Sequence, residues 1–214
     1  MYVPRHFEVS DPEILHALIR AHPLGALVVQ TADGLCASHL PFVLHPELGP
    51  HGTLRGHVAR ANPLWQEPAA HVDAHALVIF QGPQGYISPA WYATKRESGK
   101  VVPTWDYVVV HAHGPLRAIE DRVWLRQQIE QLTHAHEAGR VEPWRVSDAP
   151  ADYVERMLGA IVGLELPIAR LVGKRKLSQN RPARDRQGVV DGLLAEGSDA
   201  AAELARLVGE AGAE

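Results

Sequence analysis

The stretch GPQGYISPAWYATKRESGKVVPTWDYVVVHAHG (residues 82–114) gathers aromatic rings, cations and imidazoles between two segments that both have the character of β-strands. It holds half of the five Trp and five Tyr residues of the chain, namely Tyr86, Trp91, Tyr92, Trp105 and Tyr107. A polar loop with Lys95, Arg96 and Lys100 lies between the rings. Aromatic faces and cationic donors suit a pocket for a flat anionic ligand. Strands also favour aromatic residues, so a β-hairpin whose rings pack the core is an equally good interpretation.

The composition is that of a globular protein. The chain has 214 residues, of which 46% are hydrophobic, enough to bury the core of one large domain. No run reaches the roughly 18 consecutive apolar residues of a membrane span, and the first residues lack the apolar region of a secretory signal. We therefore expect a cytoplasmic protein. The single Cys36 excludes an internal disulfide and a thiolate metal cluster.

The charge is unevenly spread along the chain. The net charge of −4 argues against wholesale electrostatic binding of nucleic acid. Residues 174–186 nevertheless carry six cations against the single carboxylate of Asp185, hence +5, and we call them the basic segment. Its cations are Lys174, Arg175, Lys176, Arg181, Arg184 and Arg186. The basic segment could meet the phosphate of a small ligand, the phosphates of DNA, or only water.

Apolar periodicity predicts strands in the first half of the chain and helices mainly in the second. Strands are expected at residues 24–31, 35–44, 53–58, 75–81, 104–119 and 161–172, with Pro167 at a bulge or an edge of the last one. Helices are expected at about residues 12–21, 122–138, 151–158, 184–194 and 200–208. Strand and helix do not alternate, so we predict an α+β fold around a closed or partly closed antiparallel β-barrel of about six strands, with N-terminal, inserted and C-terminal helices.

The common catalytic and nucleotide-binding motifs do not occur. There is no glycine-rich dinucleotide fingerprint, phosphate loop, GxSxG elbow or HExxH motif. His111 and His113 share one face of a predicted strand, but no cysteine joins them, so we expect no metal site. The last two helices resemble a helix-turn-helix, but the second offers only Arg206 as a cation, which favours packing on the barrel.

Several blocks of the sequence resemble the PaiB family of FMN-binding negative transcriptional regulators. The blocks are YVP with HF at residues 2–7, SHLPF at 38–42, GHVARANP at 56–63, YISPAWY at 86–92, VPTWDY at 102–107 and KLSQNR at 176–181. They occur in the order of the family and extend to about Leu194. The resemblance implies a flavin-binding split-barrel domain over residues 1–194, a helical tail over residues 195–214 packed on it, a homodimer, and FMN at the dimer interface. It also implies repression of genes for extracellular protease and sporulation.

The same resemblance suggests which residues hold FMN. In the block at residues 38–42, Ser38 and Leu40 would line one flavin edge with a hydroxyl and backbone groups, and His39 is a further candidate although its side chain points to the other face of the strand. An ordinary strand with a solvent-facing histidine fits the same pattern. His57, Ala59, Arg60 and Asn62, at the end of a strand, would form the phosphate site through a bidentate guanidinium, an amide and backbone N–H groups.

Two further groups of residues are cofactor candidates on the same ground. Trp105 would pack near the flavin ring of the facing subunit and Lys100 near its anionic edge, unless both belong to the dimer core. Lys176, Ser178, Gln179 and Asn180 would close over the ligand and bond the flavin carbonyls and ring nitrogens, unless they only begin a helix.

Three functions are compatible with these residues: a flavin-binding regulator, a flavin-dependent reductase or oxidase, and a haem-binding or haem-degrading protein.

Overall fold

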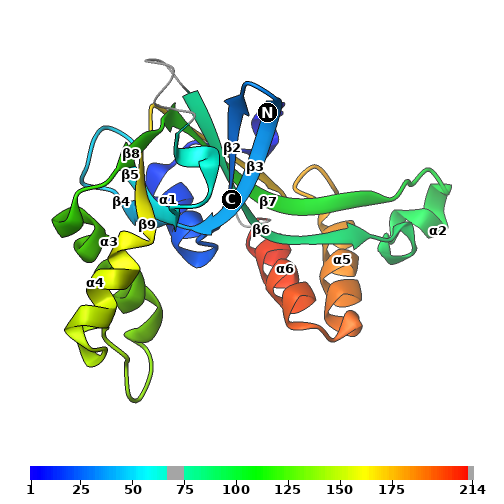
Figure 1. Cartoon of the computed structure of the whole chain (residues 1–214). Coiled ribbons are helices and arrows are strands. Elements are labelled where there is room, and N and C mark those ends of the chain that lie inside the picture. Colours follow the sequence, from blue (N-terminus) through cyan, green and yellow to red (C-terminus); the bar gives the residue numbers. More distant parts are fainter. Residues whose placement is uncertain (67–74, 212–214) are drawn as a thin grey trace. The chain divides into compact units, whose positions relative to one another are not determined.

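A computed structural model describes residues 1–66 and 75–211 and has the expected α+β architecture (Figure 1). Its helices are α1 (Pro12–Ala21), α2 (Thr94–Ser98), α3 (Arg122–Glu137), α4 (Ala151–Gly159), α5 (Ala183–Glu196) and α6 (Asp199–Glu210). Its strands are β1 (Glu8–Val9), β2 (Leu24–Thr31), β3 (Gly34–Pro41), β4 (Val43–His45), β5 (Thr53–Ala59), β6 (His75–Ile87), β7 (Thr104–Pro115), β8 (Arg117–Ile119), β9 (Ile161–Pro167) and β10 (Arg170–Lys176). Short 3-10 helices include η2 (Pro63–Trp65), η4 (Pro89–Trp91) and η5 (Val146–Asp148).

The chain divides into two compact units. The first unit comprises residues 1–11, 81–110 and 172–214, and the second comprises residues 12–80 and 111–171. Strands β6 and β7 contribute one part to each unit. The predicted tail from residue 195 onward falls within the first unit as far as the described residues extend.

The second unit is built on a hairpin and a four-stranded sheet. β2 pairs with β3 over its whole length, with Val29 opposite Cys36, and with β6 through Ala26 opposite Ile79. The four-stranded sheet has the order β4-β5-β9-β8, and its recorded registers are all antiparallel. β3 ends at Pro41 and β4 begins at Val43, so Phe42 is the corner between the hairpin and this sheet.

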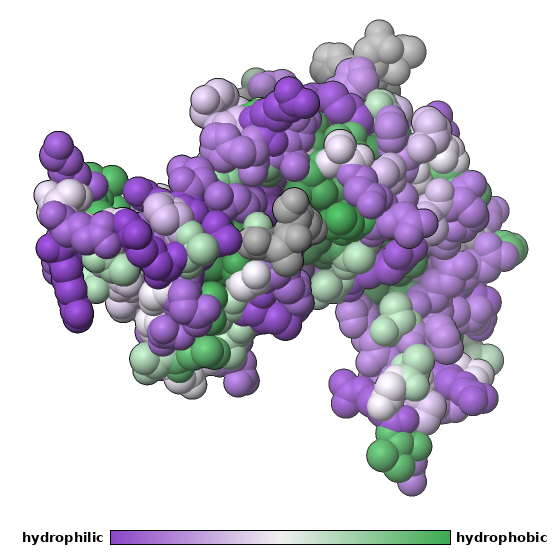
Figure 2. All heavy atoms as spheres, turned by 180° about the vertical axis from the view of Figure 1, so that it is seen from behind, coloured by the Kyte–Doolittle hydropathy of each residue, from purple (hydrophilic) through white to green (hydrophobic). Residues whose placement is uncertain are grey.

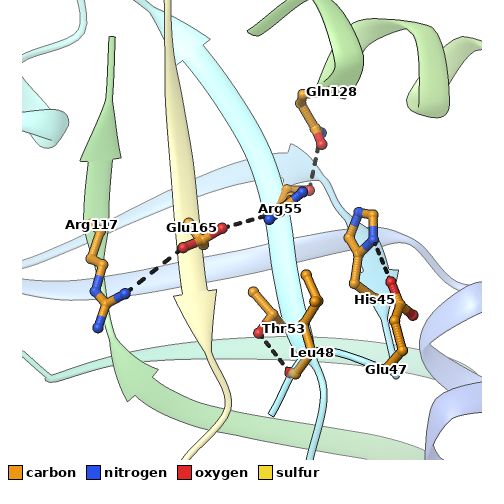
Figure 3. Close-up of polar contacts among 8 residues, drawn as sticks. All are labelled: His45, Glu47, Leu48, Thr53, Arg55, Arg117, Gln128 and Glu165. Carbon is orange, nitrogen blue, oxygen red and sulfur yellow. Dashed lines mark hydrogen bonds and ion pairs between the residues drawn. The ribbon is translucent and has the colours of Figure 1, made fainter. Parts of the chain in front are cut away.

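Helices α3 and α4 cover the four-stranded sheet through a small apolar core. Its fully or nearly fully buried members are Leu125, Val146, Val154 and Leu158, with Trp124 packed against them. A polar network lies on the sheet itself (Figure 3): the Arg55 Nε donates to Glu165 at 3.0 Å, and Arg117 lies 3.9 Å from the other carboxylate oxygen. The Gln128 side chain of α3 donates to the backbone oxygen of Arg55, which ties this helix to β5.

In the first unit, α5 and α6 pack against β6, where a Cβ added at Gly85 would meet Leu193 and Leu204. α5 and α6 lie side by side (Figure 1). A Cβ added at Gly192 would lie 2.2 Å from the Trp91 ring, so only glycine lets α5 approach η4 this closely. β1 pairs with β10 in the same unit, with Glu8 opposite Lys174. The face of the molecule in Figure 2 is mostly hydrophilic, with hydrophobic residues in smaller groups between.

The structure confirms the fold class and corrects the number of strands. Three predicted strands are each divided in two: residues 35–44 at Phe42, residues 104–119 at Leu116, and residues 161–172 at residues 168–169. Together with the two-residue β1, this makes ten strands in the described part of the chain instead of about six. Pro167 lies at the end of β9 because its ring cannot donate to a sheet ladder.

Candidate functional site

A hollow of about 520 Å³ in the second unit brings together most of the residues expected near the ligand phosphate and flavin edge. It is formed by the end of β3, the end of β5, the residues just before η2 and the first residue of β9. Its lining consists of Ser38, His39, Leu40, Pro41, His57, Val58, Ala59, Asn62 and Ile161. We call it the β3–β5 hollow. Six of these nine residues are sequence-predicted site residues, from two blocks separated by about twenty positions.

Local structure fixes the polar edge of the hollow. The Asn62 Oδ1 accepts from the Leu64 backbone N–H at 3.0 Å, which caps η2 where Pro63 opens it. The side-chain NH₂ of Asn62 forms no hydrogen bond within the part of the chain that the structure describes. It is therefore a donor left for a ligand.

His57 is the lining residue of the hollow with a ring nitrogen that is unpartnered in the described part of the chain. Its Nδ1 is buried and has no hydrogen-bond partner among the described residues. Burial lowers the pKa of His57 below its usual value, so the ring is neutral at physiological pH. A buried ring nitrogen without a partner is uncommon in native proteins, and a bound ligand is one group that satisfies it.

Arg60 does not line the hollow. Its Nε donates to the Gly159 oxygen at 3.0 Å, one terminal nitrogen donates to the Ile161 oxygen at 3.3 Å, and the other pairs with Glu120 at 2.6 Å. The guanidinium thus joins the end of β5 to the carbonyls at the end of α4, where a cation is favoured by the helix dipole. The lining of the hollow contains no Lys or Arg.

The first unit collects a second group of predicted residues around a buried carboxylate. The Lys176 amine donates to the Thr104 Oγ1 and the Trp105 backbone oxygen and lies 3.5 Å from Asp106, which is fully buried. Ser178 donates to the other Asp106 oxygen at 2.6 Å and has a positive φ of 58°. Burial raises the pKa of Asp106, opposed by the bonds from Ser178 and Lys176. We call Asp106, Lys176 and Ser178 the Asp106 cluster.

The remaining candidates of the first unit differ in exposure. The Gln179 side chain bonds the Leu177 N–H and the Arg175 oxygen, whereas Asn180 and Lys100 are exposed. Trp105 is 49% exposed, donates to Gln84 at 3.1 Å and meets Tyr86 edge to face with ring centres 6.3 Å apart. Trp105, Asn180 and Lys100 are therefore the candidates here with side-chain surface open to a partner.

The cations of the basic segment are mostly held by groups of the first unit. Lys174 is buried, donates to the Tyr2 oxygen and lies 5.0 Å from the centre of the Tyr107 ring. Arg181 lies over Tyr92, Arg184 pairs with Glu97, and Arg186 donates to the Arg181 oxygen. Arg175 is the one cation of this segment whose side chain has no such contact among the described residues. The segment is therefore not a continuous row of free cations.

The match that decides the family is to the model described as "Putative FMN-binding domain", which covers residues 1–170. The chain belongs to this family. A protein of Bacillus subtilis named "Protease synthase and sporulation protein PAI 2" is 31% identical, over 97% of this chain and 96% of its own length. An uncharacterized protein of Emericella nidulans is 38% identical over 99% of this chain and 98% of its own length. The PaiB-like resemblance of the sequence blocks is thereby confirmed.

The fold agrees with this family. The solved "Flavocytochrome Anf3 from Azotobacter vinelandii" is similar with a TM-score of 0.58 and 16% identity, over 81% of this chain and 72% of that one. It has the flavin-binding split-barrel fold, and the present chain shares that fold class.

Membership of this FMN-binding family implies that the cofactor is FMN. The size and the lining of the β3–β5 hollow are suitable for a part of the FMN molecule. The volume of the hollow lies within the usual range of small-molecule sites. Leu40, Pro41, Val58 and Ile161 supply apolar contact, while His57, Ser38 and the free Asn62 amide supply hydrogen-bonding groups. Pro41, Val58 and Ile161 were not predicted from the sequence. The first two are neighbours of predicted residues, whereas Ile161 is about a hundred residues away and had no local signal.

No described helix of the chain has both the length and the apolar character needed to cross a membrane. Among residues 1–66 and 75–211 there is no cluster of three or more His, Cys, Asp or Glu that could hold a metal. His111 and His113 do adjoin, with ring centres 6.2 Å apart.

Proposed function

We propose that this protein is a homodimeric negative transcriptional regulator whose activity depends on FMN bound in the β3–β5 hollow. The observation that carries the proposal is the convergence of six predicted residues on one hollow, among them His57, whose buried Nδ1 has no partner among the described residues. The regulatory part is supported by the relative of Bacillus subtilis, whose name refers to protease synthesis and sporulation.

The homodimer is supported by charge. FMN carries a phosphate dianion that needs cationic or multiple N–H donors, and the hollow offers neither Lys nor Arg. The first unit exposes an apolar surface that includes Tyr86 (49%), Val102 (63%) and Trp105 (49%), with exposed Lys100 nearby in sequence. We propose that a second copy brings such a surface to the flavin, so that Trp105, Lys100 and Asn180 meet the cofactor of the partner.

The proposed roles of Arg60 and of the Asp106 cluster require an exchange of bonds. Arg60 would have to leave two carbonyls and Glu120 to reach phosphate, and Lys176 would have to leave Thr104 and the Trp105 oxygen. Each such exchange replaces existing charge-assisted hydrogen bonds by new ones, so it contributes little to the free energy of FMN binding. His57, Ser38 and Asn62 can bind without this loss, and we therefore assign them the main contacts.

Titration of the FMN-free protein with FMN tests the cofactor site. We expect saturable binding with flavin absorbance and quenched flavin fluorescence, and about tenfold weaker binding for His57→Ala, the size of a lost hydrogen bond to a buried group. His134→Ala is the matched control, because this exposed histidine of α3 lies outside the hollow. A protein that remains colourless and ignores added FMN would refute the proposal, and unchanged affinity in His57→Ala would move the site elsewhere.

Arg60→Ala separates the two interpretations of this guanidinium. If Arg60 mainly holds the end of α4, the variant unfolds more easily but binds FMN almost normally while folded. If Arg60 reaches phosphate, FMN affinity falls about tenfold or more.

We propose the basic segment as the surface that binds DNA. We expect that selection from genomic fragments, using the dimer with FMN, enriches specific sites whose affinity falls steeply between low and moderate salt. Arg175→Ala removes a cation without breaking a recorded contact, and we expect it to reduce the salt slope by about one. Unchanged affinity and slope in that variant would indicate that regulation uses another surface.

A further inference from the structure

A second hollow in the second unit surrounds β4 and is not explained by the flavin site. It has a volume of about 530 Å³ and is bounded by the end of α1, by the corner and strand at residues 42–44, and by the end of α3. Its lining consists of Ile19, Arg20, Ala21, Pro23, Phe42, Val43, Leu44, Ala135 and His136. We call it the β4 groove. Strand β4 contacts both α1 and α3, so the groove is built from packed elements of one unit.

The floor of the β4 groove is apolar. Ile19, Phe42 and Leu44 are buried to at least nine-tenths, and Pro23, Val43 and two alanines complete the walls. No carboxylate, hydroxyl or amide side chain is among the lining residues. An apolar ligand body can therefore gain burial here without desolvating polar side chains.

The edge of the β4 groove carries an arginine and a histidine. Arg20 lies in the last turn of α1 and His136 in the last turn of α3. Neither side chain has a hydrogen bond or an ion pair with any residue in the described part of the chain. Two nearby basic groups without counter-ions, beside an apolar floor, complement a ligand with one apolar and one anionic end.

We propose that the β4 groove binds a small amphiphilic anion: a molecule with an alkyl or aromatic body and a single carboxylate. The apolar body lies on Phe42, Leu44 and Ile19, and the carboxylate meets the Arg20 guanidinium, with His136 adding a second donor. The volume is in the range of small-molecule pockets, and its three-sided form between two helix ends and a strand suits a compact ligand better than a flat protein surface.

The β4 groove shares a wall with the β3–β5 hollow. Leu40 and Pro41 line the hollow, and the next residues, Phe42 to Leu44, line the groove. The backbone between them is tightly packed, because a Cβ at Gly56 would lie 3.1 Å from the Pro41 oxygen and 3.2 Å from the Phe42 ring. A ligand that shifts Phe42 therefore displaces residues of the hollow. We therefore propose that anion binding in the groove changes the FMN affinity of the hollow. This coupling rests on the proposed flavin site, whereas anion binding in the groove does not.

Calorimetric titration of the FMN-free protein with decanoate tests the groove directly. We expect saturable binding of decanoate, several-fold weaker binding of decanol, and none of decyltrimethylammonium. Arg20→Gln should weaken decanoate about fivefold and leave decanol unchanged, because only the anion uses the guanidinium. Arg206→Gln is the matched control, since this exposed arginine near the end of α6 lies outside the groove. Equal affinity for decanoate and decanol, or no effect of Arg20→Gln, would overturn the proposal.

A filling variant locates the bound ligand. Ala135 is an exposed residue of α3 at the groove wall, so Ala135→Trp can occupy the groove without disturbing the core. We expect it to abolish decanoate binding at unchanged melting temperature. Unchanged decanoate affinity in Ala135→Trp would refute binding in the groove, and Ala21→Phe repeats the test from the opposite wall.

FMN titration with and without saturating decanoate tests the coupling. We expect at least a threefold change in FMN affinity in the wild-type protein and no change in Ala135→Trp. Decanoate binding with unaltered FMN affinity would refute the coupling alone. Failure to bind FMN under any condition would refute the proposed flavin site. The decanoate titration would remain a valid test of the groove, because it uses FMN-free protein.

Discussion

Replacement of Lys176 by methionine tests whether the Asp106 cluster is a structural lock of the first unit. Asp106 is fully buried, and the Lys176 amine is the cation that opposes its charge. Lys176→Met keeps the length of the side chain but removes the donor to the Thr104 hydroxyl and the Trp105 oxygen. It also leaves a carboxylate buried with only Ser178 as a recorded side-chain donor.

The expected cost follows from these contacts. Breaking a buried ion pair by removing one partner typically costs about 3–5 kcal/mol, and the 3.5 Å separation of Lys176 and Asp106 places this case near the lower end. Asp106→Asn keeps an acceptor for Ser178 and removes a charge that burial disfavours, as the raised pKa of Asp106 indicates. We expect it to cost only about 1 kcal/mol. The double variant should then lose about 2 kcal/mol, less than Lys176→Met alone.

Equilibrium urea denaturation at pH 7.5, followed by far-UV circular dichroism, measures all three free energies of unfolding. Lys95→Met is the control, because this exposed lysine of α2 has no side-chain contact among the described residues and no proposed role, and we expect a change within about 0.5 kcal/mol. A loss below about 1 kcal/mol in Lys176→Met, or a double variant whose loss equals the sum of the single losses, would refute the reasoning.

Three further predictions concern the rest of the chain. Glu165→Gln should lower the free energy of unfolding by about 2 kcal/mol in urea, because it leaves the two arginines beside this largely buried carboxylate without their anion. Gly192→Ala should lower it by about 2 kcal/mol, since the new methyl group meets Trp91, whereas Gly209→Ala, with open space around it, should raise it slightly. Burial lowers the pKa of His111 to about 4, so the unfolded chain takes up a proton first as the pH falls below 6.5. Stability should therefore fall by about 1–2 kcal/mol between pH 7 and pH 4, with solvent screening of this partly exposed ring allowed for, and melting temperatures of His111→Asn should show less of this decline.

Local signals in the sequence were sufficient for most elements of the fold. Pro12, which suits the first turn of a helix, and apolar residues at helical spacing predicted α1 with its observed bounds. The divided strands were not predictable in the same way, because apolar periodicity continues across a corner such as Phe42. What separates β3 from β4 there is a change of partner strand: the Phe42 N–H still donates to the Pro23 oxygen at 2.9 Å, in the register of β2 and β3, whereas Val43 pairs with Arg55 of β5. Such a change leaves no mark in the neighbouring residues.

In the candidate site, too, contacts between residues far apart in the sequence could not be predicted. The residue types in SHLPF and GHVARANP, with the family resemblance, led to Ser38, His57 and Asn62, and the structure places all three on one hollow. For Arg60 the residue type indicated the chemistry of the side chain but not the direction in which it points. Its guanidinium turns to the carbonyls of Gly159 and Ile161, about a hundred positions away, which no local pattern could reveal.

The position of Arg60 bears on whether a single chain can complete the proposed flavin site. The hollow gains rigidity from this guanidinium, because its bonds at the end of β5 also fix Ile161, a lining residue. The same bonds remove the nearest cation from the hollow, so the phosphate dianion must be met by backbone donors or by another subunit. If the second subunit supplies that charge, FMN affinity depends on protein concentration below the dimer dissociation constant. If backbone donors suffice, FMN affinity is independent of dilution, and a titration at two protein concentrations distinguishes the two cases.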